Sequence, residues 1–372
     1  MENQYKVALL ATGDEISNGD ILNTNAQEIA RKLFDHSIHV GMHVVTSDRI
    51  MDIEQAILFL LQSHQALIIT GGLGPTSDDL TRFALSQVVN QPLVFHTECW
   101  DIIADRLKRL GYDAPPESNR QQALFPAEAM IIPNPNGTAA GCLILHNDRL
   151  VFMLPGPPTE CLPMLHSAVL PKLKELGFPK NEYHQKWLLF GVSEGQIAET
   201  LDELAKPYDC ITGYRLCYPY IEFKIHCKDA EVFKTLTSLV ETAIHSHLIR
   251  DGKKTASELL RHHLETIDFN LGICDRATGG LLETTLKTPK NQQHLDFHSS
   301  NENFKAPATY IDISGLKAFW HEKNTTQATL DMTFHMLGKN TDISTTIPFR
   351  GQRVKQYAVE FICWKILDFL NA

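Results

Sequence analysis

The sequence feature that most constrains the fold is a glycine-rich segment between an apolar run and a helical pattern. Residues 66–70 are apolar enough to form a buried strand, and residues 71–81 read Gly-Gly-Leu-Gly-Pro-Thr-Ser-Asp-Asp-Leu-Thr. Leu80, Phe83 and Val88 then follow with helical spacing. A strand followed by a glycine-rich turn and a helix is typical of α/β proteins, which bind ligands at the carboxyl ends of their strands.

The chemistry of this segment favours a site for phosphate and metal. Glycines let backbone N–H groups approach an anion closely, and the following helix N-terminus adds partial positive charge. Asp78 and Asp79 supply the oxygen ligands that divalent cations prefer. The structural alternative, in which one acid caps the helix, needs only a single carboxylate and perhaps one glycine. We therefore favour the functional interpretation.

Strand and helix patterns alternate over about the first 170 residues, which predicts a parallel sheet covered on both faces. Glu15 follows the predicted strand 5–12, and Asp48 follows the predicted strand 38–46. If these strands are parallel neighbours, Glu15, Asp48 and Asp79 converge at one edge of the sheet. Three carboxylates repel one another unless a cation compensates, and a bound divalent metal is the ordinary compensation at a phosphate site.

Three further polar or turn-forming segments could contact a ligand. They are residues 118–122, 134–141 and 154–160, which contain Asn119, Arg120, Gln122, Asn134, Gly137, Thr138 and Gly156. Tight loops explain the two glycine- and proline-rich segments as well as ligand contact does. Both interpretations stay open at this stage.

Composition excludes several classes of function. The 372 residues include 34 basic and 44 acidic side chains, and the net charge of −10 argues against binding to nucleic acid. The eight cysteines contain no Cys-x-x-Cys pair, so neither a zinc site nor a disulfide framework is expected. Neither a targeting segment nor an apolar run of about 18 residues is found, so we expect a cytoplasmic protein with no membrane partner.

Breaks in the pattern predict three domains, over residues 1–176, 177–250 and 251–372. The pattern is interrupted at 177–181 and again at 251–254. The middle region contains a capping box, Ser193-x-x-Gln196, ahead of a helix, and reads as a small α+β unit. The last region turns polar from 287 to 305, which predicts a flexible loop.

Several motifs, taken in their order along the chain, resemble those of a known family. They are Thr12-Gly-Asp-Glu15, Asn23-Thr-Asn25, the segment from Thr70 to Thr81, Ser118-Asn-Arg-Gln-Gln122, Asn134-Pro-Asn-Gly-Thr138 and Leu154-Pro-Gly-Pro-Pro158. Together they resemble the CinA family of competence/damage-inducible proteins, whose N-terminal domain has the molybdopterin-binding fold of MoaB, MogA and MoeA. The resemblance implies a three-layer α/β/α MogA-like domain, a small α+β domain of KH type, and an α/β CinA C-terminal domain.

The resemblance also implies an activity, the metal-dependent hydrolysis of ADP-ribose to AMP and ribose 5-phosphate. By position, Glu15, Asp48 and Asp79 match acids that act in catalysis and hold a divalent metal, either Mg²⁺, Mn²⁺ or Co²⁺. The implied substrate-binding residues are Thr12, Gly13, Asp14, Asn25, Gly71, Gly72, Gly74, Pro75, Thr76, Asp78, Asn119, Gln122, Asn134, Gly137, Thr138 and Gly156. Relatives of this fold self-associate, so a homodimer is expected. The alternative is a scaffold protein that binds molybdopterin or a nucleotide without turnover.

The C-terminal region departs from the family pattern at its key residue. The family's nicotinamide mononucleotide deamidase domain carries Ala-Glu-Ser-Cys-Thr-Gly-Gly with a nucleophilic serine, whereas residues 274–280 read Cys-Asp-Arg-Ala-Thr-Gly-Gly. Arg276 stands in the place of the serine, and a guanidinium cannot attack an amide carbonyl. We therefore expect a degenerate domain without deamidase activity.

Overall fold

The computed structural model describes residues 6–178, 182–300, 307–320, 326–336, 339–348 and 351–370. The chain divides into two compact units, residues 1–181 and residues 182–372. The division falls beside the predicted break at 177–181, of which residues 179–181 lie outside the described residues. The predicted further boundary near residue 250 lies within the second unit and stays a prediction.

The first unit is built on a six-stranded sheet with the order β2-β1-β3-β8-β7-β6. Its four parallel strands are β1 (Val7–Thr12), β2 (Val40–Thr46), β3 (Ala66–Thr70) and β8 (Arg149–Leu154). The strands β7 (Gly141–His146) and β6 (Met130–Ile132) extend the sheet in antiparallel pairs. The register pairs Thr12 with Thr46 and Thr70 with Leu154. The carboxyl ends of the parallel strands therefore meet at one edge of the sheet.

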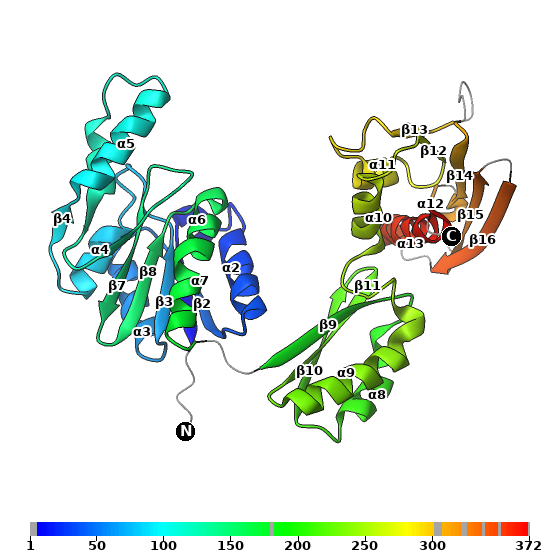
Figure 1. Ribbon diagram of the computed structural model, residues 1–372, viewed down its shortest axis with the longest axis horizontal. Helices are drawn as coiled ribbons and strands as arrows, with labels where there is room; N and C mark the ends of the chain where they lie inside the picture. The colour runs from blue at the N-terminus through cyan, green and yellow to red at the C-terminus, as the bar shows by residue number, and fades with distance from the viewer. Residues whose placement is uncertain are drawn as a thin grey trace. The chain divides into compact units, whose positions relative to one another are not determined.

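Helices cover both faces of this sheet (Figure 1). Successive side chains of β1 point to opposite faces and are apolar on both, so both faces must be covered. Ala8 and Leu10 belong to the hydrophobic cluster on the face covered by α3 (Ile50–Leu61), α4 (Thr81–Val88) and α5 (Thr97–Arg109). Val7 and Leu9 belong to the cluster on the opposite face, with α2 (Thr24–Asp35), α6 (Pro158–Met164) and α7 (Leu170–Glu175). The predicted three-layer α/β/α architecture is confirmed.

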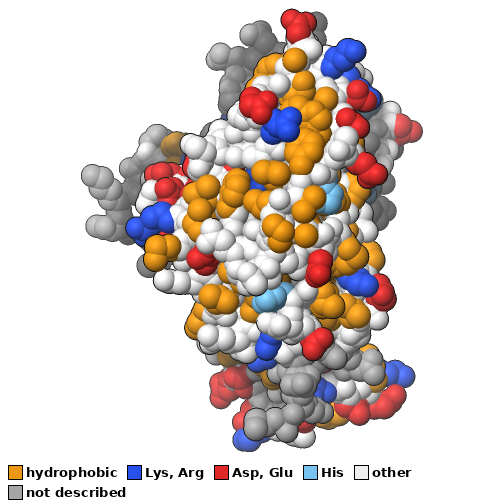
Figure 2. Space-filling model, turned by 90° about the vertical axis from the view of Figure 1, so that its left-hand side faces the viewer, with side chains coloured by type: hydrophobic (Ala, Val, Ile, Leu, Met, Phe, Trp, Pro, Cys, Tyr) orange, Lys and Arg blue, Asp and Glu red, His pale blue; other side chains and the backbone are white. Residues whose placement is uncertain are grey.

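Shorter elements complete the first unit. They are α1 (Asp14–Ser17), the two-stranded sheet of β4 (Leu93–Phe95) and β5 (Leu124–Pro126), a 3₁₀ helix over Glu117–Ala123 and a π-helical turn over Leu165–Val169. Figure 2 shows hydrophobic side chains gathered in the upper part of one face, over α5 and the turn after it. Ile102, Leu110 and Tyr112 are exposed there.

The second unit begins with the predicted small α+β element. An antiparallel sheet has the order β10-β11-β9, with β9 at Tyr183–Phe190, β10 at Cys210–Cys217 and β11 at Tyr220–Cys227. It packs against α8 (Glu194–Ala205) and α9 (Ala230–Ile244). The predicted capping box is present, since Ser193 and Gln196 exchange hydrogen bonds at the start of α8.

The rest of the second unit is a five-stranded mixed sheet with the order β13-β12-β14-β15-β16. Its strands are β12 (Leu271–Asp275), β13 (Leu295–His298), β14 (Thr309–Gly315), β15 (Gln327–Met336) and β16 (Lys339–Pro348). The helices are α10 (Ala256–Leu264), α11 (Leu281–Leu286), α12 (Lys317–Trp320) and α13 (Val354–Leu370), with 3₁₀ turns at His245–His247 and Gly351–Arg353.

The prediction of a flexible loop over 287–305 is wrong for its centre. Leu295–His298 forms β13, which pairs in parallel with β12, and Leu295 is buried in the hydrophobic cluster. Residues 301–306 of that prediction lie outside the described residues. A four-residue edge strand in a polar stretch carries too few apolar residues to reveal its period.

Within the described residues, none of the helices is both long and apolar enough to cross a lipid bilayer.

Candidate active site

A cavity of about 570 Å³ opens at the edge where the parallel strands of the first unit end. Thr12 is the last residue of β1, and Thr70 is the last residue of β3. Asp48 lies just after β2, and Gly156 lies just after β8. All four line the cavity. The sheet topology therefore brings segments from four separate parts of the sequence to one hollow.

Most of the predicted site residues line this cavity. They are Thr12, Gly13, Glu15, Asn25, Asp48, Gly71, Gly72, Gly74, Pro75, Asp78, Asp79, Gln122, Thr138 and Gly156. The three acids expected to converge, Glu15, Asp48 and Asp79, are therefore together. Their roles in binding and catalysis stay predictions.

The other five predicted site residues are absent from the cavity lining, yet each contacts a residue that belongs to it. Asp14 bonds to Asp48, Thr76 to Asp79, Asn119 to Gln122 and Asn134 to Glu160, and Gly137 packs against the Glu160 carboxylate. These five residues therefore lie directly beside the lining, and their roles in substrate binding stay predictions.

The glycine turn after β3 has a backbone that other residues could not adopt. Gly71 and Gly72 have φ angles of 104° and 65°, in the left-handed region. A Cβ atom on Gly71 would lie 2.4 Å from the Thr12 carbonyl oxygen, and one on Gly72 would lie 2.1 Å from Thr81 Oγ1. The Thr12 and Thr81 hydroxyls are buried and hydrogen-bond to each other at 2.9 Å. The turn is consequently fixed against the end of β1.

Asp79 holds the second half of this turn. Its Oδ1 accepts the Gly74 N–H at 2.7 Å, and its Oδ2 accepts the Thr76 N–H at 2.9 Å and the Thr76 hydroxyl at 2.5 Å. Because both oxygens are occupied, the carboxylate positions the turn in this structure. Sequence reasoning assigned Asp79 to a metal and did not reveal these bonds.

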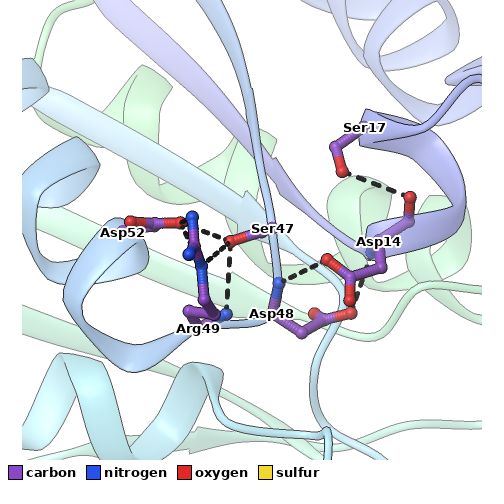
Figure 3. Close-up of polar contacts among 6 residues, drawn as sticks. All are labelled: Asp14, Ser17, Ser47, Asp48, Arg49 and Asp52. Carbon is purple, nitrogen blue, oxygen red and sulfur yellow. Dashed lines mark hydrogen bonds and ion pairs between the residues drawn. The ribbon is translucent and has the colours of Figure 1, made fainter.

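Asp48 and Asp14 lock two loops together. The Asp14 N–H donates to Asp48 Oδ2 at 2.9 Å, and the Asp48 N–H donates to Asp14 Oδ1 at 3.3 Å (Figure 3). Burial raises the pKa of Asp48 above its ordinary value, and the charges of Asp14, Glu15 and Asp78 raise it further. Asp48 is therefore close enough to the other three carboxyl groups to be repelled by them.

The positive side chain nearest to Asp48 in sequence does not relieve this repulsion. Arg49 turns toward the other side of its loop, where it binds Asp52 at 2.7 Å and Ser47 at 3.4 Å (Figure 3). Glu15 lines the cavity, and within the described part of the chain no side chain hydrogen-bonds to its carboxylate. The cluster consequently offers hard oxygen ligands with uncompensated charge, which fits a divalent cation.

Sequence reasoning missed Arg82 at this site and left Glu160 and Arg120 open. Arg82 lies fully buried beneath the glycine turn, one residue beyond the motif that ends at Thr81. Glu160, the last residue of the open segment 154–160, lines the cavity. Arg120, left open as a ligand contact, instead lies over the rings of Phe95 and Trp100 at 4.7 and 5.7 Å.

Comparison with known proteins identifies the family. A family model described as a probable molybdopterin binding domain matches residues 8–175. A CinA-like protein of Geobacter sulfurreducens is 32% identical over 74% of this chain and 69% of its own length. The chain belongs to the CinA-like family. A competence-damage inducible protein of Clostridium novyi is 34% identical over 74% of this chain and 68% of its own length.

A solved structure of a family member is similar to part of the chain. The crystal structure of CinA from Thermoplasma acidophilum is 28% identical, covers 46% of this chain and 99% of that protein, and has a TM-score of 0.43. The family model and the six-stranded sheet of the first unit agree with the α/β fold expected from the motifs. The chain is thus a CinA-like protein with a molybdopterin-binding-type domain.

Proposed function

We propose that the first unit hydrolyses the phosphoanhydride bond of an ADP-ribose-like nucleotide to AMP and ribose 5-phosphate. The observation that carries this proposal is the meeting, in one cavity, of a glycine turn and an acidic cluster, with no Lys or Arg side chain among the described lining residues. The glycine turn suits a phosphate group, and the acidic cluster suits a metal ion. Metal-dependent hydrolysis of a phosphoanhydride uses both the glycine turn and the acidic cluster.

Within this proposal each residue has a specific task. Glu15 and Asp48 would hold a divalent cation, and Asp14 orients Asp48 through its backbone N–H. A cation bound there would supply a nucleophilic hydroxide from water at neutral pH and polarise the phosphoryl oxygen. Asp79 keeps the turn in the shape that presents N–H groups to the cavity. Those N–H groups stabilise the charge that develops on the phosphate oxygens.

The test is direct. Purified full-length protein is incubated with ADP-ribose and Mg²⁺, Mn²⁺ or Co²⁺, and AMP is measured by chromatography. The proposal predicts AMP and ribose 5-phosphate in equal amounts, with no product after EDTA is added. Failure to form AMP with any of the three metals would reject the proposal.

A second candidate is supported by the description of the matching family model, which names molybdopterin binding. In this alternative the cavity binds molybdopterin or a nucleotide without turnover, and the protein acts as a scaffold. Calorimetry with AMP in the absence of hydrolysis would support it. Detection of steady ADP-ribose turnover would exclude it as the main function.

For the second unit we propose the absence of deamidase activity. Arg276 forms an ion pair with Asp312 at 2.5 Å. Trp320 donates its indole N–H to the Ala277 carbonyl at 3.0 Å, and its ring would lie 2.9 Å from a Cβ on Gly279. These contacts occupy the segment in which the family places its nucleophile. Release of ammonia from nicotinamide mononucleotide would refute this proposal.

A further inference from the structure

Two carbonyl oxygens of the glycine turn, those of Leu73 and Gly74, accept hydrogen bonds from three side chains. Arg82 Nη2 donates to the Leu73 carbonyl at 2.6 Å, and Arg82 Nη1 donates to the Gly74 carbonyl at 3.3 Å. Gln122 adds a bond of 3.3 Å to Leu73, and Gln121 adds one of 3.1 Å to Gly74. The Leu73 and Gly74 carbonyl oxygens are therefore already occupied by protein donors.

Two N–H groups of the same turn, unlike its Leu73 and Gly74 carbonyl oxygens, have no hydrogen-bond partner among the described residues. The Gly74 N–H is taken by Asp79. The N–H groups of Gly72 and Leu73 donate to no acceptor among the residues that the structure describes, and both residues line the cavity. Because an unpaired N–H costs free energy, a ligand oxygen is the partner that these two groups lack.

Arg82 also carries a charge that its surroundings do not neutralise. The side chain is 0% exposed, its Nε has no hydrogen-bond partner, and across the described ranges no carboxylate forms an ion pair with it. Burial lowers the pKa of Arg82 to about 10, so the guanidinium is still protonated at neutral pH. Asp79 acts on it only at longer range. A buried cation without an ion pair is costly, and an anion at the turn would offset that cost.

We propose that Arg82 is a positioning residue that makes the glycine turn select a phosphate group over a neutral ligand. It acts through the peptide groups of Leu73 and Gly74 and does not touch the ligand. The inference rests on the phosphate site of the proposed function but not on hydrolysis. It also predicts that part of the phosphate affinity is independent of metal.

Calorimetry on the full chain in buffer with EDTA tests the inference, with AMP and adenosine as paired ligands. Wild-type protein is expected to bind AMP at least about tenfold more tightly than adenosine. Arg82→Gln should weaken AMP binding about tenfold and leave adenosine binding within about twofold. Arg82→Lys should fall between the two, because it keeps the charge but loses the paired donors.

Arg149→Gln is the matched control. Arg149 donates to the His64 carbonyl at 2.7 Å from the start of β8, the opposite end of the strand from the cavity. Its loss should change neither affinity. Equal losses of AMP and adenosine binding in Arg82→Gln would overturn the inference, because they indicate a structural role alone.

The remaining outcomes separate the two proposals. If wild-type protein binds neither AMP nor inorganic phosphate under any condition, the phosphate site of the proposed function fails. If wild-type protein binds AMP but Arg82→Gln binds it equally well, only the inference fails. Should neither Arg82 variant fold, wild-type protein that binds AMP no more tightly than adenosine in EDTA overturns the inference.

Discussion

At the scale of single residues, the glycine turn has little freedom to accept substitutions. Gly72 combines a left-handed φ of 65° with a neighbour that a Cβ atom would meet at 2.1 Å. Gly156 lines the same cavity, but the nearest atom to a Cβ there is 3.7 Å away. A comparison of substitutions at the two positions therefore distinguishes the effect of backbone strain from the effect of replacing a glycine that is not strained.

We expect Gly72→Ala to lower the free energy of unfolding by about 1–3 kcal/mol, because the alanine is strained and clashes with Thr81. Gly156→Ala should change it by less than about 0.5 kcal/mol. Urea denaturation followed by circular dichroism measures both. Equal effects of the two substitutions would contradict the described geometry.

The cysteines allow a second test of the described packing. Cys99, Cys142, Cys161, Cys227, Cys274 and Cys363 are buried, whereas Cys210 and Cys217 are half-buried. Burial raises the pKa of both Cys142 and Cys161 to about 12, so almost no thiolate forms at pH 8.

Ellman's reagent at pH 8 should accordingly modify at most two thiols quickly in the native protein and all eight in denaturant. Mass spectrometry of the labelled peptides should identify Cys210 and Cys217. Rapid labelling of Cys142 in the native state would show that the face of the sheet under α4 is open.

At the scale of elements, the second unit depends on a buried hydrogen-bond network that joins β11 to two helices. Tyr220 Oη donates to Glu360 Oε2 at 2.7 Å and accepts the Ala256 N–H at 2.8 Å. Glu360 also accepts the Ser257 N–H and hydroxyl at the start of α10. Phe190 and Tyr220 belong to the same hydrophobic cluster as α10 and α13. The small α+β element and the five-stranded sheet consequently share a core.

Tyr220→Phe removes one of the donors to Glu360 and leaves the Ala256 N–H without its partner, so it should lower the free energy of unfolding by about 1–3 kcal/mol at pH 7. Burial and the Glu360 charge raise the pKa of Tyr220. The folded state thus retains this proton more strongly than the unfolded state, and the stabilisation falls as pH rises above about 10.

The difference in stability between wild type and Tyr220→Phe should therefore narrow above pH 10. Tyr112→Phe is the control, because Tyr112 is 51% exposed, and it should match wild type throughout. A difference that is constant or grows with pH would be inconsistent with the network.

The helices and strands also show which features can be predicted from the sequence and which cannot. The parallel strands were predictable because runs such as 66–69 are apolar throughout. The meeting of the acids that follow them was predictable because the carboxyl ends of neighbouring parallel strands lie at one edge of the sheet. Arg82 was not predictable, since its contacts depend on the tertiary position of the turn. The bonds of Asp79 were missed for the same reason, and β13 was missed because its pairing is supplied by β12 from a distant part of the sequence.

At the scale of the whole molecule, the residues that line the cavity all lie between Thr12 and Glu160. They therefore belong to the first unit, which has its own sheet and its own hydrophobic clusters on both faces. Self-association stays a prediction. The exposed apolar side chains on α5 are one surface at which it could be sought (Figure 2).

We expect a fragment of residues 1–181 to release AMP from ADP-ribose with a kcat/KM within about threefold of the full chain, because the described cavity takes nothing from the second unit. Steady-state kinetics on the purified fragment, with circular dichroism to establish that it is folded, measures this. A folded fragment without activity would assign a catalytic contribution to residues 182–372.

The central claim is that Glu15 and Asp48 make the acidic half of a hydrolytic site, and two neighbouring acids test it most directly. Asp48 lines the cavity, whereas Asp52 binds Arg49 and is absent from the lining (Figure 3). The measurement is the rate of AMP release from ADP-ribose with saturating Mn²⁺ for Asp48→Asn and Asp52→Asn. The account predicts a loss of about 100-fold or more for Asp48→Asn and a change of less than about twofold for Asp52→Asn. Equal rates for both variants and wild type would contradict it.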